Sequence, residues 1–83
     1  MKIQVTEEDI CLGRKGSARR CPIALAIQRN LACDGKKVYV NARDIEFCYR
    51  DRIFFTISLS NECSYFVDAF DNGGEVLPFE FYI

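Results

Sequence analysis

The chain contains no histidine and no tryptophan, and its 83 residues include only two prolines and five glycines. Because histidine is the commonest general base in proteins, a serine or cysteine nucleophile here would lack its usual partner. The carboxylates show no spacing that is specific to acid–base catalysis. We therefore expect a protein that is not an enzyme and that uses no cofactor.

The five cysteines also lack the patterns that mark a metal site or a disulfide framework. They lie 10, 12, 15 and 15 residues apart, with no CxxC pair. Structural zinc sites usually take paired ligands from tight turns, so we expect no metal site. An odd number in a short chain argues against a disulfide framework. We expect most of the five to be reduced, buried apolar side chains: Cys11, Cys21, Cys33, Cys48 and Cys63.

No apolar run approaches the roughly 20 residues that span a bilayer. The first residues, MKIQVTEED, turn acidic at once and contain no apolar segment like the centre of a signal peptide. The chain is 49% hydrophobic and 28% charged, which is typical of globular proteins. We expect one cytoplasmic domain, residues 1–83, with no membrane contact.

The hydrophobic pattern predicts the element order β-α-α-β-β-β-α-β. Strands are expected at residues 2–5, 37–41, 44–50, 53–59 and 76–83, and helices at 7–12, 22–32 and 61–71. Because the consecutive strands in the middle favour antiparallel hairpins, we expect an α+β fold. Its form would be a two-layer sandwich, with a mainly antiparallel sheet and the helices on one face.

Residues at the expected boundaries support these elements. Thr6 and Asp9 have the form of a capping box at the start of the first helix, and Gly13 stands where a glycine would end it. Asp34-Gly35 indicates a turn after the second helix. Asp51-Arg52 is a plausible tight connection between two strands, although it lacks glycine.

Alternation along the strands assigns the apolar side chains to faces. The expected inward residues are Ile53, Phe55, Ile57 and Leu59 in one strand and Leu77, Phe79, Phe81 and Ile83 in the last. Alternation leaves Phe54, Tyr39 and Tyr82 on the opposite face. There they would form an exposed patch of the kind found at protein interfaces, unless the helices or a dimer mate cover them.

The segment RKGSARR places four cations before a predicted helix: Arg14, Lys15, Arg19 and Arg20. The free N–H groups of a helix N-terminus also favour anions. The segment is therefore a candidate contact for nucleic-acid phosphates or for acidic side chains of a protein. It lacks the GxxxxGK[ST] spacing of a phosphate-binding P-loop. The alternative is solvated charge on a flexible loop.

Charge is distributed unevenly along the chain. Residues 14–37 contain seven basic residues and one acidic residue, whereas residues 51–83 contain six acidic residues and one basic residue. This asymmetry predicts a polarised surface that would steer a charged partner. The alternative is that the two segments lie side by side and neutralise each other.

The segments VTEEDICLG and CPIALAIQRNL, together with the ending FDNGGEVLPFEFYI, resemble small proteins encoded by bacteriophages and prophages. The resemblance implies an accessory phage product. Such products include inhibitors of host defence, among them anti-CRISPR proteins, which bind an effector complex and block its DNA access or its nuclease recruitment. The resemblance supplies no site residues.

Together these features predict a small inhibitor that binds a host defence protein, such as a CRISPR effector, and acts by steric occlusion in the bacterial cytoplasm. The expected contact residues are Arg14, Lys15, Arg19, Arg20, Tyr39 and Phe54. An alternative is a nucleic-acid-binding or regulatory module that uses the same loop on phosphates. A third hypothesis is a structural protein whose sheet edge mediates self-association, for example as a homodimer.

Overall fold

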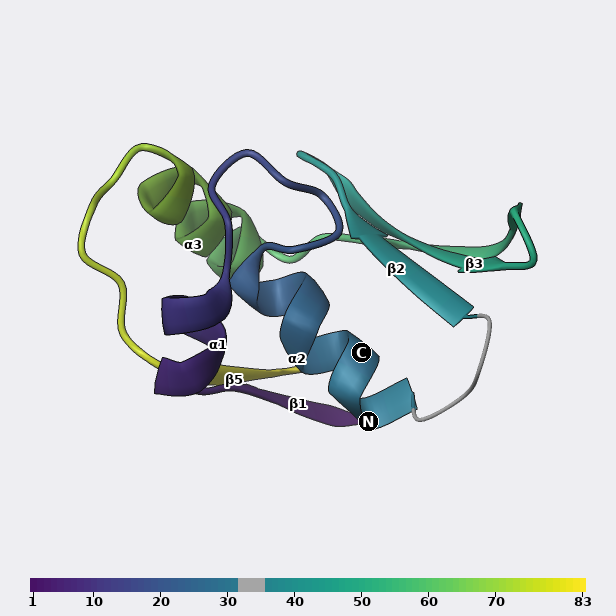
Figure 1. The fold of residues 1–83 in the computed structure, drawn as a ribbon, viewed down its shortest axis with the longest axis horizontal. Coiled ribbons are helices and arrows are strands. Elements are labelled where there is room, and N and C mark those ends of the chain that lie inside the picture. The colour runs from purple at the N-terminus through teal and green to yellow at the C-terminus, as the bar shows by residue number, and fades with distance from the viewer. Residues whose placement is uncertain (32–35) are drawn as a thin grey trace.

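The structure, a computed structural model, describes residues 1–31 and 36–83 (Figure 1). Its elements are β1 (Lys2–Val5), α1 (Glu7–Leu12), α2 (Pro22–Leu31), β2 (Lys36–Val40), β3 (Asp44–Tyr49), β4 (Arg52–Ser58), α3 (Asn61–Asp71) and β5 (Phe79–Tyr82). The predicted element order and the α+β class are confirmed. The expected helix end at residue 32 and the Asp34-Gly35 turn lie outside the described residues.

The strands are divided between two antiparallel sheets. β1 pairs with β5, which brings the two ends of the chain together, and β2, β3 and β4 form the second sheet in that order. α2 contacts both β1 and β2 and lies between the two sheets (Figure 1). Its side chains Ile23, Ala26 and Ile27 are completely buried, so this helix is the centre of the fold.

The capping box at the start of α1 is formed as predicted. The Thr6 hydroxyl accepts a hydrogen bond from the Asp9 backbone N–H, and the Asp9 carboxylate accepts one from the Thr6 backbone N–H. The helix ends at Leu12, and Gly13 follows with an extended backbone, φ −66°. A β-carbon on Gly13 would lie 2.7 Å from the Pro22 ring. Glycine is therefore required by the close approach of α2.

The turn between β3 and β4 consists of Arg50 and Asp51, one residue earlier than predicted. Their φ angles are 50° and 66°. Positive values at both central residues are those of a type I′ turn, whose twist matches the twist of the flanking strands. Glycine usually supplies this conformation, and here two ordinary residues adopt it.

A β-bulge interrupts the pairing of β3 with β4. Phe47 pairs with Phe55, whereas the next residue of β3, Cys48, pairs with Ile53, which leaves Phe54 as the extra residue. Ile53 and Phe55, both expected to be buried on the inward face, are 58% and 53% exposed. Phe55 keeps the face of its partner Phe47, so only the face assigned to Ile53 is wrong. The bulge moves Ile53 to the other face of the sheet. The hairpin end also projects beyond the described helices (Figure 1).

The last strand is shorter than predicted, because residues 75–78 belong to neither a helix nor a strand. Leu77, expected to face inward, is 79% exposed, and Ile83 is 37% exposed. Pro78 has no N–H to donate to a strand partner, and pairing starts after it. Phe79 does pack inward, with its ring centre 4.8 Å from that of Phe66 in α3.

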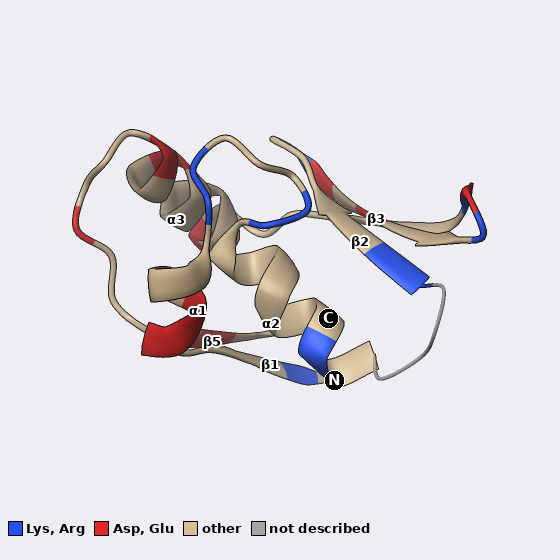
Figure 2. Cartoon of the chain, in the orientation of Figure 1, with Lys and Arg blue, Asp and Glu red and all other residues tan. Residues whose placement is uncertain are grey.

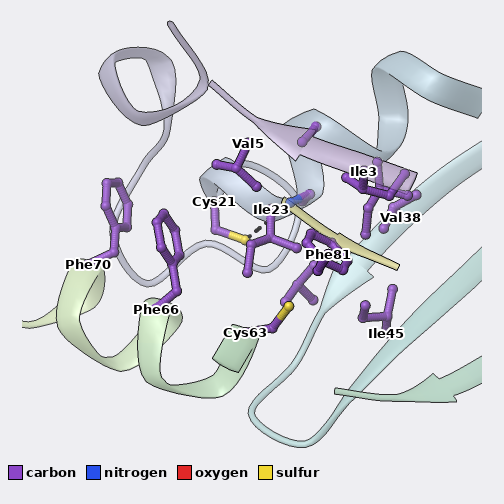
Figure 3. Packing of buried hydrophobic residues seen from close by; sticks show 14 of the residues in the cluster. Ile3, Val5, Cys21, Ile23, Val38, Ile45, Cys63, Phe66, Phe70 and Phe81 are labelled. Atoms are coloured by element: carbon purple, nitrogen blue, oxygen red, sulfur yellow. Dashed lines mark hydrogen bonds between the residues drawn. The ribbon is translucent and has the colours of Figure 1, made fainter. Parts of the chain in front are cut away.

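α3 begins after Ser60, whose hydroxyl accepts a hydrogen bond from the Cys63 N–H at 3.2 Å. Its buried side chains Cys63, Phe66 and Phe70 follow the predicted helical stripe. They join a core that also contains, from the two sheets, Ile3, Val5, Phe81, Val38, Ile45 and Phe47 (Figure 3). None of the described helices has both the length and the apolar character needed to cross a membrane.

Candidate binding surfaces

Residues 14–20, called here the basic loop, have a defined conformation. The Arg14 N–H donates to the Arg20 carbonyl at 2.8 Å, which closes the base of the loop. The Val40 N–H donates to the Ala18 carbonyl at 2.8 Å, which joins the loop to the end of β2. The backbone is therefore held at both its base and its side.

A third contact holds the tip of the basic loop. The Gly16 N–H donates to Asp71 Oδ1 at 2.9 Å, at the end of α3. Gly16 has a φ of 69°, a left-handed conformation that glycine adopts without steric cost. The basic loop and the end of α3 are thus neighbours: the Gly16 N–H meets the Asp71 carboxylate, and the Lys15 ammonium lies close to Gly73, just after the helix.

The four cations of the basic loop are exposed. Figure 2 shows their positions in blue along the loop before α2. None of them forms an ion pair with a carboxylate of residues 1–31 or 36–83, where the two ion pairs are Lys2–Glu80 and Arg29–Asp9. The structure brings together the four predicted contact residues of this segment: Arg14, Lys15, Arg19 and Arg20. Their charge is therefore available to a partner.

Arg29 belongs to the basic segment of the sequence but not to this surface. Its Nη1 lies 2.6 Å from Asp9 Oδ1, and its Nη2 donates to Asp9 Oδ2 and to the Gln4 carbonyl. Burial raises the pKa of the Asp9 carboxyl, but hydrogen bonds from Arg29 and Thr6, with the Arg29 charge, outweigh burial and hold that pKa below its ordinary value. This pair serves the fold.

Tyr39 lies beside the basic loop. Its side chain is half-buried on β2, and the guanidinium carbon of Arg19 lies 5.8 Å from its ring centre, a cation–π contact. Tyr39 also borders a depression of about 300 Å³ whose lining includes Lys37, Glu46 and Cys48. The predicted contact surface therefore continues from the loop onto this face of the sheet.

Phe54 does not join that surface. It lines a separate depression of about 380 Å³ with Lys36, Tyr49 and Arg52. Lys36 and Tyr49 are direct strand partners on the side that faces the core. Phe54 thus lies on the face opposite to Tyr39, which corrects the prediction that they share a face. The prediction rests on unbroken alternation of side chains along β4, whereas a bulge reverses the face of the residues on one side of it.

Three residues around Phe54 were not predicted as site residues: Lys36, Tyr49 and Arg52. Tyr49 and Arg52 flank the Arg50-Asp51 turn, and Lys36 pairs with Tyr49 on the neighbouring strand. Closeness to the hairpin turn could have indicated that these residues are exposed, because side chains beside the turn of a long hairpin can extend past the layer that covers the sheet. An inward residue in such a place is exposed, as the 41% exposure of Tyr49 shows.

A cavity of about 280 Å³ lies between the basic loop, the end of β2 and α3. Its polar lining includes Ser17, Asn41 and Asp68, and Cys21 borders it. Burial raises the pKa of the Cys21 thiol, which therefore stays protonated and weakly nucleophilic at neutral pH. Within residues 1–31 and 36–83, no three His, Cys, Asp or Glu side chains come close enough to hold a metal ion.

The resemblance of residues 5–13, 21–31 and 70–83 to small phage-encoded proteins stays a prediction, as do the partner and the inhibitor function that it implies. Comparison of the chain with protein-family models, with curated proteins and with solved structures finds no match.

Proposed function

We propose that this chain is a small binding protein that uses the basic loop to dock on an acidic surface of a partner protein and blocks that surface for other ligands. The observation that supports this most is a loop held at three points by hydrogen bonds, with four exposed cations that no described carboxylate pairs. A loop that is already ordered loses little conformational entropy on binding. Its charge speeds the encounter with an acidic partner.

Tyr39 extends the proposed contact beyond pure charge. Aromatic and arginine side chains are enriched in the energetically important centres of protein interfaces. Arg19 and Tyr39 already stand in contact, so they can enter an interface as one unit with little reorganisation. The loop would supply attraction at the rim, and the tyrosine ring would supply apolar contact area.

Within this class we propose an inhibitor of a bacterial host defence protein, such as a CRISPR effector, that acts in the host cytoplasm by steric occlusion. The support for this narrower proposal is the resemblance to phage-encoded products. Its direct test is target-DNA binding by purified effector complexes with and without an excess of the protein. Unchanged DNA binding and cleavage across the effectors of the host would remove the narrower proposal.

Charge reversal in the basic loop tests the docking surface. The variant Arg19→Glu with Arg20→Glu is expected to lose at least tenfold in affinity for a partner captured from the bacterial host and then purified. Its melting temperature should fall by at most about 8 °C, because both side chains are exposed and the cation–π contact that Arg19 loses with Tyr39 contributes about 0.5–1 kcal/mol. Arg43→Glu reverses an exposed charge outside the loop and is the control that keeps affinity. Equal affinity of the loop variant and the wild type would contradict the proposal.

Nucleic acid is the alternative partner of the same loop. Binding to phosphates weakens steeply as salt increases, because counterions are released from the nucleic acid. A protein interface that includes Tyr39 should respond less to salt. Capture of nucleic acid with no protein partner, together with a steep salt dependence that Arg19→Glu with Arg20→Glu abolishes, would replace the protein-binding proposal with this alternative.

A further inference from the structure

The hairpin end of the β2–β3–β4 sheet carries a second exposed surface that the basic loop does not use. Three aromatic side chains on its core-facing side are exposed, Tyr49 at 41%, Phe54 at 55% and Phe55 at 53%, whereas Ile53, which is 58% exposed, lies on the other face. Every residue of β4 except Ile57 is exposed. Contiguous apolar exposure of this kind marks a binding surface.

The bulge brings the aromatic rings to one face. Phe55 pairs with the inward-facing Phe47, and the extra residue Phe54 lines the same depression as Tyr49. The Phe55 ring is held against Phe47, with ring centres 5.7 Å apart. The surface thus presents aromatic rings on an open sheet that no described helix covers at this end (Figure 1). We call Tyr49, Phe54 and Phe55, with their neighbouring cations, the hairpin platform.

Cations are placed directly on these rings. The Lys36 ammonium lies 5.7 Å from the ring centre of Phe54, and the Arg50 guanidinium lies 5.2 Å from that of Tyr49. Arg52 pairs with Tyr49 across the strands and lines the depression beside it. Three cations thus surround the rings, and the hairpin turn adds one carboxylate, Asp51. The platform is positive on a chain whose net charge is −1.

The charges of the hairpin platform indicate which class of ligand it can bind. A second copy of the chain would bring Lys36, Arg50 and Arg52 of both copies together, and the bulge in β4 would interrupt the pairing of two free edges. Insertion of the hairpin end into a lipid bilayer would bring the charged turn residues Arg50 and Asp51 into the apolar layer, which is unfavourable. An occupant with flat apolar groups linked by negative charges complements the rings and the cations at once.

We propose that the hairpin platform binds single-stranded nucleic acid. Unpaired bases stack on exposed aromatic rings, and their phosphates contact cations beside the rings. A duplex hides its base faces within the stack and offers only phosphates to this surface. The site uses residues other than those of the basic loop, so it stands or falls independently of the docking function proposed above.

Fluorescence anisotropy with a fluorescein-labelled twelve-nucleotide oligo-dT strand tests the platform. The wild-type protein binds the single strand and binds the matching dT–dA duplex at least tenfold more weakly. Phe54→Ala weakens single-strand binding between about 5-fold and about 150-fold, the range expected for loss of one stacked base. Arg52→Ala weakens binding and lowers the slope of log affinity against log salt by about 0.7.

Two control variants complete the experiment. Tyr65→Ala removes an exposed tyrosine on α3, 74% accessible, and keeps the affinity for the strand. Arg19→Glu with Arg20→Glu changes the basic loop. When Phe54→Ala is added to this loop variant, it is expected to weaken strand binding by the same factor as in the wild type. Unfolding curves of all variants verify that each is folded, and this is expected because the replaced side chains are exposed.

Several results would overturn the platform. They are undetectable strand binding at low salt, equal binding of strand and duplex, or a Phe54→Ala variant that binds the strand like the wild type. Sedimentation that shows a dimer lost in Phe54→Ala would assign the surface to a second copy. If Arg19→Glu with Arg20→Glu abolished strand binding and Phe54→Ala did not, the nucleic-acid site would be assigned to the basic loop and not to the hairpin platform.

Discussion

Arg29 in α2 and Asp9 in α1 form a two-point ion pair, with N–O distances of 2.6 and 3.1 Å. Asp9 is only 4% exposed and also completes the capping box with Thr6. Arg29 in turn donates to the Gln4 carbonyl of β1 at 2.9 Å. This ion pair therefore holds together the start of α1, the end of α2 and β1, the last through Arg29.

Replacing Asp9 by Asn is expected to destabilise the fold by about 1–3 kcal/mol. The amide has nearly the same size, but it leaves Arg29 without its counter-charge at a buried contact. This loss of stability is smaller than that expected for a fully buried ion pair, because the Arg29 side chain is 49% exposed. Thermal unfolding should show a lower midpoint, by roughly 4–8 °C for each kcal/mol. Glu7→Gln, an exposed charge change in the same turn, is the control. Equal losses in both variants would contradict a specific ion pair.

The same pair predicts a loss of stability in acid. The folded-state pKa of Asp9 lies below its ordinary value of 3.8, so its contribution is complete above that value and is lost as the pH falls through the folded-state pKa. Hydrogen bonds from Lys2 and Gln4, with the Lys2 charge, also lower the pKa of Glu80, so part of the acid response will remain without Asp9. Urea midpoints measured from pH 7 to pH 3 should fall more for the wild type than for Asp9→Asn. Parallel curves would show that Asp9 does not carry the effect.

Asp71→Ala is expected to loosen the tip of the basic loop while the rest of the fold stays intact. The substitution removes the acceptor of the Gly16 N–H, and a hydrogen bond to a charged group contributes about 1.5–3 kcal/mol. Because Asp71 is exposed, we place the loss at or below the lower end of that range. The protection of the Gly16 amide against hydrogen exchange should fall about 5- to 10-fold.

Asp68→Ala provides the matched control for the loop, because it removes the same charge one helical turn earlier. The contacts of Asp68 to Asn72 use its backbone carbonyl, which the substitution keeps. Amide exchange of Gly16 in this variant should match the wild type. If both variants lose protection equally, charge near the loop, and not the hydrogen bond, controls its order.

Thiol reactivity should separate Cys11 from the buried cysteines. Cys11 is exposed, whereas Cys21, Cys48 and Cys63 are buried. Burial raises the pKa of the Cys21 and Cys63 thiols, which lowers the fraction of reactive thiolate. In titration of the native protein with a thiol reagent, Cys11→Ser should remove one rapidly reacting group and Cys63→Ala should remove none. If Cys63→Ala removed the rapidly reacting group and Cys11→Ser removed none, the assignment of Cys11 as exposed and Cys63 as buried would be contradicted.

Features that depend on neighbours within one helical turn could be predicted from the sequence. The Thr6–Asp9 spacing forms its capping box, and Ser60 starts the helix that buries Cys63 and Phe66. Each of these signals brings donor and acceptor, or apolar groups, to the same side through helix geometry alone. The cations of the basic loop could be named for the same reason, since they are consecutive in the chain.

Features that depend on distant segments could not be predicted. The contacts that order the basic loop come from Val40 and Asp71, far along the chain. The bulge at Phe54 reverses the face of part of β4, and no residue in RIFFTIS marks its position. The partner of Arg29, Asp9, lies 20 residues away in the chain. A count of charges along the sequence therefore includes Arg29 in the basic segment although its charge is paired.

The pairing of β1 with β5 has a consequence for synthesis. The register runs from Lys2–Tyr82 to Val5–Phe79, so the first of the five described strands to be synthesised pairs with the last of the five. The hairpin of β3 and β4 closes on a two-residue turn and can form early, while the β1–β5 sheet must bring together segments more than seventy residues apart. Until residues 79–82 leave the ribosome, the nascent chain keeps Ile3 and Val5 without their strand partners.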